Sequence, residues 1–250
     1  MSNLVRGEFY KLRKSKYFIG MIIMSIILSF PLIEMWSNDV QGTPMLHHGI
    51  YSINYAFMFI ALSSLIFALL AGDFIAKDFK NKNISKSFIY GYSRREVILS
   101  KLVVFIVFSL FLELIYTVIL VIYASMMYGF CEALDFNTVV YLIRIIGVGI
   151  ICNVATISII GTGAIITKST FFTFSSMIIL LLSFIFFDLL TCFKKLFLVV
   201  SCIHPYIAGM WAMKRFAPKL DIIVGTVSPI LIFVITIVVS LLYTRYEDIK

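Results

Sequence analysis

The chain has few charged residues and little proline. Of its 250 residues, 14% are Asp, Glu, Lys or Arg, five are proline and 61% are hydrophobic, and the mean hydropathy is +1.04. Soluble domains are about half apolar and roughly a quarter charged. A soluble core could not bury this much apolar surface. The composition therefore predicts a membrane protein whose spans share one interior, as a single domain over residues 1–250.

Sequence motifs for catalysis and metal binding are lacking as well. No HExxH, GxSxG or P-loop pattern occurs, so we predict no nucleotide site, cofactor or catalytic residue in this chain. The cysteines show no metal-ligand spacing, and a disulfide among Cys131, Cys192 and Cys202 is left open. The pair His47–His48 has no acidic or cysteine partner at ligand spacing, which favours a solvated loop.

Long apolar runs fill most of the chain. A helix needs about 20 apolar residues to cross roughly 30 Å of hydrocarbon, and a helix satisfies its own backbone in lipid. An all-α polytopic fold is therefore predicted, with six spans at about 17–36, 53–72, 102–124, 139–167, 170–190 and 222–243. A seventh span at 196–213 is the alternative to a re-entrant or interfacial outer hairpin within 191–221. We favour the hairpin because His204, Pro205 and Gly209 interrupt the apolar run.

Basic residues gather in segments that would share one side of a membrane. Fifteen of the 21 Lys and Arg residues lie in the N-terminus, the loop 73–101, the turn at Lys168 and the tail after Tyr243. The segments 37–52 and 125–138 hold none, whereas 191–221 holds five. Because basic segments tend to stay in the cytoplasm, we predict a multi-pass protein of a bacterial cell membrane with both termini cytoplasmic.

Residues 4–16, before the first span, combine an apolar face with basic side chains. Val5, Phe9 and Leu12 share one side of a helical wheel. This pattern predicts an amphipathic elbow helix in the inner headgroup layer, held by apolar burial and anionic lipid. An ordinary basic flank would explain the charges but not the apolar spacing.

Four ionisable residues fall inside the predicted spans. Glu34 and Asp188 lie near span ends, Arg144 about two turns inside the fourth span, and Glu113 near the middle of the third. Burying charge in lipid is costly, so Glu113 and Arg144 are candidate intramembrane polar residues that line a polar route or hold the spans in register. Alternatively, Arg144 reaches the interface and Glu113 hydrogen-bonds within the bundle. A Glu113–Arg144 pair would be offset in depth.

The inner loop 73–101 is longer than a simple connection between two spans needs to be. It has helical propensity around 74–80, a break at Gly91, and then a second basic helix that leads into the third span. Aromatic and acidic side chains among its basic residues suit a protein surface better than lipid headgroups. We therefore predict that this loop docks on a soluble partner.

Two segments resemble the ABC-2 type transporter permeases. EFYKLRKSKYF at 8–18 is similar to the N-terminal elbow of that family. Asp78-Phe79, Gly91-Tyr92-Ser93-Arg94 and Lys101 are similar to the pattern of its first cytoplasmic loop, although Lys82-Asn83 stands where Gly-Thr is common. Within the family, the chain looks most like small Gram-positive permeases for lantibiotic immunity or antimicrobial-peptide export.

The resemblance implies the transmembrane subunit of an ATP-driven exporter. Two permease subunits, identical or different, would pair in the lipid, and each would dock on a separate ATPase subunit that binds ATP and magnesium. The cargo would be an amphipathic or antimicrobial peptide, and no nucleic acid is expected. The docking contacts implied for the cytoplasmic coupling helix are Asp78, Phe79, Lys80, Asn83, Ile84, Lys86 and Arg94.

Two other functions stay open at this point. An intramembrane protease or lipid-modifying enzyme would need a polar cluster at one depth, and the sequence offers only the scattered Glu113, Arg144, Asp188 and His204. A sensor or immunity protein could bind a peptide without transporting it. Turnover by the isolated subunit would favour the enzyme, and ATPase-dependent peptide efflux would exclude the sensor.

Overall fold

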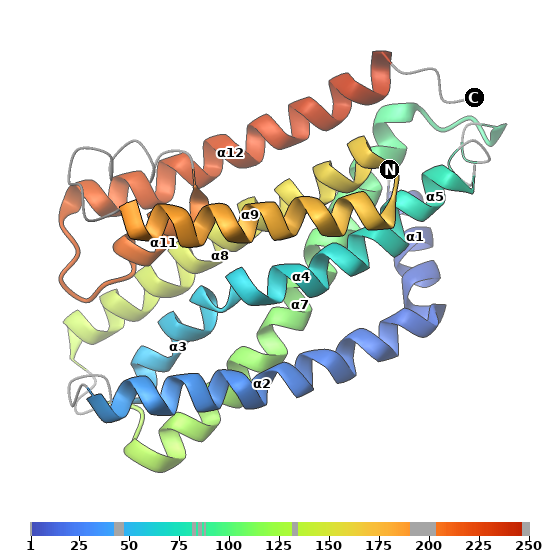
Figure 1. Cartoon of the computed structure of the whole chain (residues 1–250). Coiled ribbons are helices and arrows are strands. Elements are labelled where there is room, and N and C mark those ends of the chain that lie inside the picture. Colours follow the sequence, from blue (N-terminus) through green and yellow to red (C-terminus); the bar gives the residue numbers. More distant parts are fainter. Residues whose placement is uncertain are drawn as a thin grey trace.

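The computed structural model describes residues 2–42, 48–81, 84, 87, 89–131, 135–190 and 204–246, all in helices, turns or short connections (Figure 1). The helices are α1 (Ser2–Lys14), α2 (Lys16–Gly42), α3 (Gly49–Met58), α4 (Ile60–Ala71), the π-helical segment Gly72–Ala76, α5 (Lys77–Lys80), α7 (Arg94–Tyr128), α8 (Phe136–Thr167), α9 (Thr170–Leu190), α11 (Pro205–Ala212) and α12 (Lys219–Tyr246).

Five helical stretches in the described residues are long and apolar enough to cross a membrane. They are Lys16–Val40, Ile60–Lys80, Arg94–Tyr128, Phe136–Thr167 and Lys219–Arg245. They correspond to the predicted first, second, third, fourth and last spans. The predicted fifth span, 170–190, coincides with α9, but the side chains of 183–190 lie outside the described part. The count of six spans therefore stays a prediction.

The predicted second span, 53–72, lies within a longer helical stretch that runs from Gly49 to Lys80. The helix is interrupted at Phe59, where α3 ends and α4 begins, and it then continues past Gly72 to Lys80. Burial of Phe74 and Ile75 extends the apolar face beyond Gly72, and Lys77 donates to Asp73 Oδ1 over 2.9 Å, one turn apart. These contacts keep the first part of the predicted loop helical.

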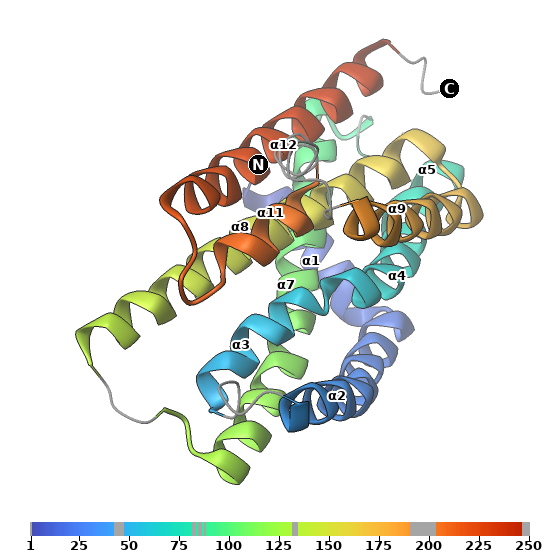
Figure 2. The ribbon, with the colours of Figure 1, turned by 60° about the vertical axis from the view of Figure 1, so that its left-hand side comes forward.

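Helices α2 and α12 lie on opposite sides of the bundle, and α8 runs between α12 and α7 (Figure 2). Only 22% of the apolar stretch in α2 and 17% of that in α12 is buried, against 61% in Ile60–Lys80. A helix that is apolar but uncovered requires lipid or another apolar surface around it. The two outer helices therefore present long apolar faces that a bilayer would cover.

The short helix α11 packs between α8 and α12. A Cβ on Gly209 would lie 2.8 Å from Cys152 Sγ, and one on Gly225 would lie 2.3 Å from Ala212 Cβ, so glycine permits both close approaches. Eight residues span only about 12 Å, which is too short to cross a membrane. Residues 196–203 lie outside the described part, so the re-entrant hairpin stays a prediction.

Helix α1 is a separate element that ends before a break at Ser15. Leu4 and Leu12 are buried, and Val5 and Phe9 pack partly against the same core. The apolar face predicted from the sequence therefore faces the protein, where α1 packs against α7. Its place in a headgroup layer remains a prediction.

Two cysteines fall within the described residues, and both are free thiols: Cys131 and the buried Cys152. Cys192, Cys202 and His47 lie outside the described part. Among the residues that the structure describes, no group of three or more His, Cys, Asp or Glu side chains gathers where it could hold a metal ion.

Candidate functional site

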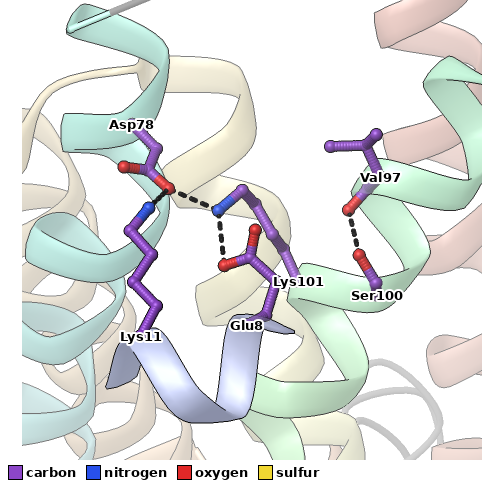
Figure 3. A network of polar contacts seen from close by, with 6 residues as sticks. All are labelled: Glu8, Lys11, Asp78, Val97, Ser100 and Lys101. Atoms are coloured by element: carbon purple, nitrogen blue, oxygen red, sulfur yellow. Dashed lines mark hydrogen bonds and ion pairs between the residues drawn. The ribbon is translucent and has the colours of Figure 1, made fainter. Parts of the chain in front are cut away.

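A charged network joins three segments at one end of the bundle, where α1, α5 and the start of α7 meet (Figure 3). Glu8 and Lys11 come from α1, Asp78 from α5 and Lys101 from α7. Glu8 and Lys11 are three residues apart, which places them on one face of α1. Asp78 lies on the helical extension beyond Gly72, which presents it to both lysines.

Lys101 is the centre of this network. Its Nζ donates to Asp78 Oδ2 and, over 3.0 Å, to Glu8 Oε2, and it lies 5.0 Å from the centre of the Phe74 ring. Lys11 Nζ donates to the same Asp78 oxygen. The Lys101 and Asp78 side chains are only 2% and 8% exposed, whereas that of Lys11 is 47% exposed. Two carboxylates and two ammonium groups balance, so the buried charges are compensated.

A second contact joins α5 to Lys168 in the turn between α8 and α9. The ring of Phe79 is buried, and Lys168 Nζ lies 5.5 Å from it and 5.6 Å from the ring of Tyr243. Lys168 adopts a left-handed conformation with φ of 50° between α8 and α9. The Tyr243 hydroxyl donates to the Ile166 carbonyl over 3.2 Å. Phe79 thus links α5 to the α8–α9 turn and to the end of α12.

The loop returns to the membrane through a strong helix start. Gly91 has φ of +84°, which favours glycine. The Ser93 side chain accepts from the Glu96 backbone N–H, and Glu96 accepts from the Ser93 N–H over 3.1 Å, which forms a capping box. This confirms the predicted break and second basic helix, and it orients the start of α7 that carries Lys101.

The docking residues implied by the resemblance divide into two groups. Asp78, Phe79 and Ile84 are buried within the chain, whereas Lys80 and Arg94 are exposed. The other two, Asn83 and Lys86, lie outside the described residues.

Several further side chains of this loop are exposed and were not among the docking residues expected from the sequence. They are Asn81, Ile89, Tyr90, Tyr92 and Arg95. The surface open to a partner therefore differs from the residues that carry the sequence motif.

Glu113 forms a polar contact in the middle of the bundle. It is buried on α7, and its Oε1 accepts from Asn153 Nδ2 of α8, which also lies 3.4 Å from the Phe57 carbonyl at the end of α3. Its Oε2 is buried and has no hydrogen-bond partner among the described residues. Asn153 was not singled out from the sequence, because an amide in an apolar run carries no positional signal.

Arg144 does not pair with Glu113. Its Nη2 donates to the backbone carbonyls of Lys214, over 2.5 Å, and Arg215, over 3.1 Å, beyond the end of α11. Glu113, Arg144 and His204 thus have separate partners or positions, and the side chain of Asp188 lies outside the described part. Glu113 and Arg144 therefore do not form one polar site.

These features define the class of the protein: a polytopic helical membrane component with a compensated charged network at one end. The chain belongs to the ABC-2 transporter family: the sequence model described as "ABC-2 family transporter protein" matches residues 4–187, which is most of the chain. Searches of curated proteins and of solved structures gave no significant match.

Membership of this family establishes the general role of the chain. It is a multi-pass membrane protein and the membrane component of an ABC transporter. The ATPase of such a transporter lies in a separate partner subunit, with which this chain associates.

Proposed function

We propose that this chain is the permease subunit of an exporter that removes an amphipathic or antimicrobial peptide from a bacterial cell membrane, in immunity or resistance. In this proposal the chain forms one transmembrane domain of six spans with cytoplasmic termini. Two permeases pair, and each docks on one ATPase that binds ATP and magnesium. The observation that carries the proposal is the Asp78 network, which ties the loop predicted to dock to α1 and α7.

The network would transmit movement of the loop into the bundle. A displacement of α5 pulls on Lys11 of α1 and Lys101 of α7 through Asp78. It also acts on the α8–α9 turn through Phe79 and Lys168. Packed side chains and buried ion pairs resist continuous deformation, so such a displacement moves the helices together. ATP-driven closure of two ATPases would in this way reposition several spans at once.

Docking itself falls in this proposal to the exposed side chains of the loop. Lys80, Tyr90 and Arg94 would contact the ATPase, with Asn83 and Lys86 as further candidates. Asp78, Phe79 and Ile84 would hold the loop in position rather than touch the partner, because they are buried. This assignment separates residues that bind the ATPase from residues that transmit movement of the loop to the helices.

The test is co-purification of the tagged full-length chain with its cognate ATPase. We expect the triple substitution Lys80→Glu, Tyr90→Ala and Arg94→Glu to lower ATPase recovery at least tenfold while the permease stays folded. The matched control is Phe216→Ala with Lys219→Glu, an exposed aromatic and an exposed cation at the other end of the bundle. Equal ATPase recovery in all three proteins would refute the docking surface.

Export is tested separately in cells that express the permease with its ATPase. Efflux of a fluorescent cationic amphipathic peptide should require a functional ATPase and should be lost in the triple variant. Peptide protection that persists with an inactive ATPase would refute export and favour a protein that only binds the peptide.

A further inference from the structure

Three cations gather at the end of the bundle opposite the Asp78 network. Arg144 projects from α8, about two turns from its start, and Lys214 and Arg215 lie in the connection between α11 and α12. Backbone contacts join them, because Arg144 Nη2 donates to the carbonyls of both Lys214 and Arg215. The cluster therefore brings together segments about 70 residues apart in the sequence.

Aromatic side chains hold both guanidinium groups. Arg144 lies 5.3 Å from the centre of the Tyr141 ring. Arg215 donates through Nη1 to the Tyr51 hydroxyl and lies 5.9 Å from the Tyr51 ring. The Tyr51 and Tyr141 rings are themselves 6.0 Å apart. Guanidinium groups fixed in this way lose little side-chain entropy when they bind an anion.

The positive charge of this cluster is not balanced by ion pairs within the part of the chain that the structure describes. No carboxylate of the described residues forms an ion pair with Arg144, Lys214 or Arg215, although Asp221 interacts with Lys214 at longer range. The Arg144 Nε is buried without a hydrogen-bond partner within the same part of the chain. Lys214 Nζ lies 3.2 Å from the Trp211 ring centre, and burial lowers the pKa of Lys214. One half-buried and two exposed cations with spare donors suit an anion with several acceptor oxygens.

The surroundings of the cluster are apolar and exposed. On α8, Val140 is one turn before Arg144 and Ile143 is adjacent to it, with exposed fractions of 48% and 64%, and Phe216 next to Arg215 is 89% exposed. A Cβ on Gly147 would meet no atom within 4 Å, so this face of α8 is open. In a membrane protein, such a face contacts acyl chains, and cations at its edge meet headgroups.

We propose that Arg144, Lys214 and Arg215 form a binding site for the phosphate of a phospholipid headgroup, with the acyl chains lying along the open face of α8. The site also gives a role to two of the five basic residues of 191–221, a segment that runs against the charge bias of the rest of the chain. It does not depend on the identity of the transported cargo.

The experiment measures lipid binding by native mass spectrometry on the purified full-length chain, titrated with phosphatidylglycerol. The variant Lys214→Gln with Arg215→Gln keeps the backbone carbonyls that accept from Arg144. We expect it to bind the most strongly retained lipid roughly tenfold to thirtyfold more weakly, because each Lys or Arg near anionic lipid contributes about 1 kcal/mol. The control, Arg95→Gln with Arg245→Gln, removes two exposed cations near the other end and should bind that lipid like the wild type.

Two competitors distinguish the source of the phosphate. Diacylglycerol, which has the acyl chains without a phosphate, should not displace the lipid. Inorganic phosphate at the same concentration should displace it only weakly. Equal lipid binding by the variant and the wild type would overturn the site, and displacement by inorganic phosphate alone, at concentrations matching the lipid, would overturn the assignment to a lipid headgroup. Tyr51→Phe, which keeps every charge, should lower the affinity less than the double variant.

Discussion

The two ends of the bundle carry opposite kinds of charged cluster. At one end, Asp78 and Glu8 neutralise Lys101 and Lys11, and the central pair is buried. At the other end, Arg144, Lys214 and Arg215 face backbone carbonyls and aromatic rings but form no ion pair with the described carboxylates. A buried cluster with balanced charges fixes helices to one another, whereas a cluster of positive charges alone can bind an external anion. Basic side chains thus stabilise the packing of helices at one end and are available to bind an anion at the other.

The largest expected effect is at the centre of the balanced network. Lys101→Met removes the buried cation that pairs with both the Asp78 carboxylate and Glu8. Removing one partner of a buried ion pair typically costs about 3–5 kcal/mol. We expect the detergent-purified variant to unfold at a markedly lower temperature than the wild type, as measured by thermal unfolding.

The control for this change is Lys16→Met, an exposed lysine at the start of α2, which should be close to neutral. Adding Asp78→Asn to Lys101→Met should recover part of the stability, because the buried carboxylate that lost Lys101 is then gone. A loss no greater than that of Lys16→Met would mean that the network does not hold α1, α5 and α7 together.

The second change removes the cation that organises the unbalanced cluster. Arg144→Met deletes two hydrogen bonds to the carbonyls of Lys214 and Arg215 but also removes a like charge. The acceptors lie near exposed residues and can bind water, so we expect a loss of about 1–2 kcal/mol. A loss as large as that of Lys101→Met in the same unfolding assay would contradict the contrast between the two clusters.

Features of the fold that depend on neighbouring residues could be predicted from the sequence. A turn at Gly91 and a helix start at Ser93 to Glu96 are encoded locally, and the structure has both. The apolar runs predicted most spans because length and hydropathy decide them locally. The interruption at Phe59 was not predicted, because it depends on packing against other helices, whereas the helix Lys77–Lys80 falls in the segment 74–80 with predicted helical propensity.

Partners distant in the sequence could not be predicted in this way. Lys101 bonds to residues 23 and 93 positions away, and no local pattern encodes that approach. The motif drew attention to Asp78 and Phe79, yet their burial is decided by the fold. Arg144 was expected either to line a polar route or to reach the interface, and its contacts with Lys214 and Arg215 depend on how α11 packs against α8.

A smaller effect is expected at the exposed edge of the balanced network. Lys11→Met leaves Asp78 paired with the buried Lys101, and the Lys11 side chain is already 47% exposed. Half-exposed ion pairs contribute less than about 1 kcal/mol. Combining Lys11→Met with Lys101→Met should cost more than the two single losses together, because each lysine partly compensates the Asp78 carboxylate when the other is removed. Strict additivity in unfolding measurements would indicate that the two lysines act independently.

The smallest change in stability should come from Lys214→Gln with Arg215→Gln, and its sign should differ. Removing two of three like charges relieves repulsion, which offsets the loss of the exposed Arg215–Tyr51 hydrogen bond, and the backbone carbonyls still accept from Arg144. The free energy of unfolding should therefore stay within about 0.5 kcal/mol of the wild type or rise slightly. Salt screens such repulsion over about 10 Å at 0.1 M. The lipid-free wild type should therefore gain stability between 20 and 200 mM salt, and the variant should gain less. If the variant instead lost as much stability as Lys101→Met, Lys214 and Arg215 would stabilise helix packing in the wild type, and the contrast between the two clusters would fail.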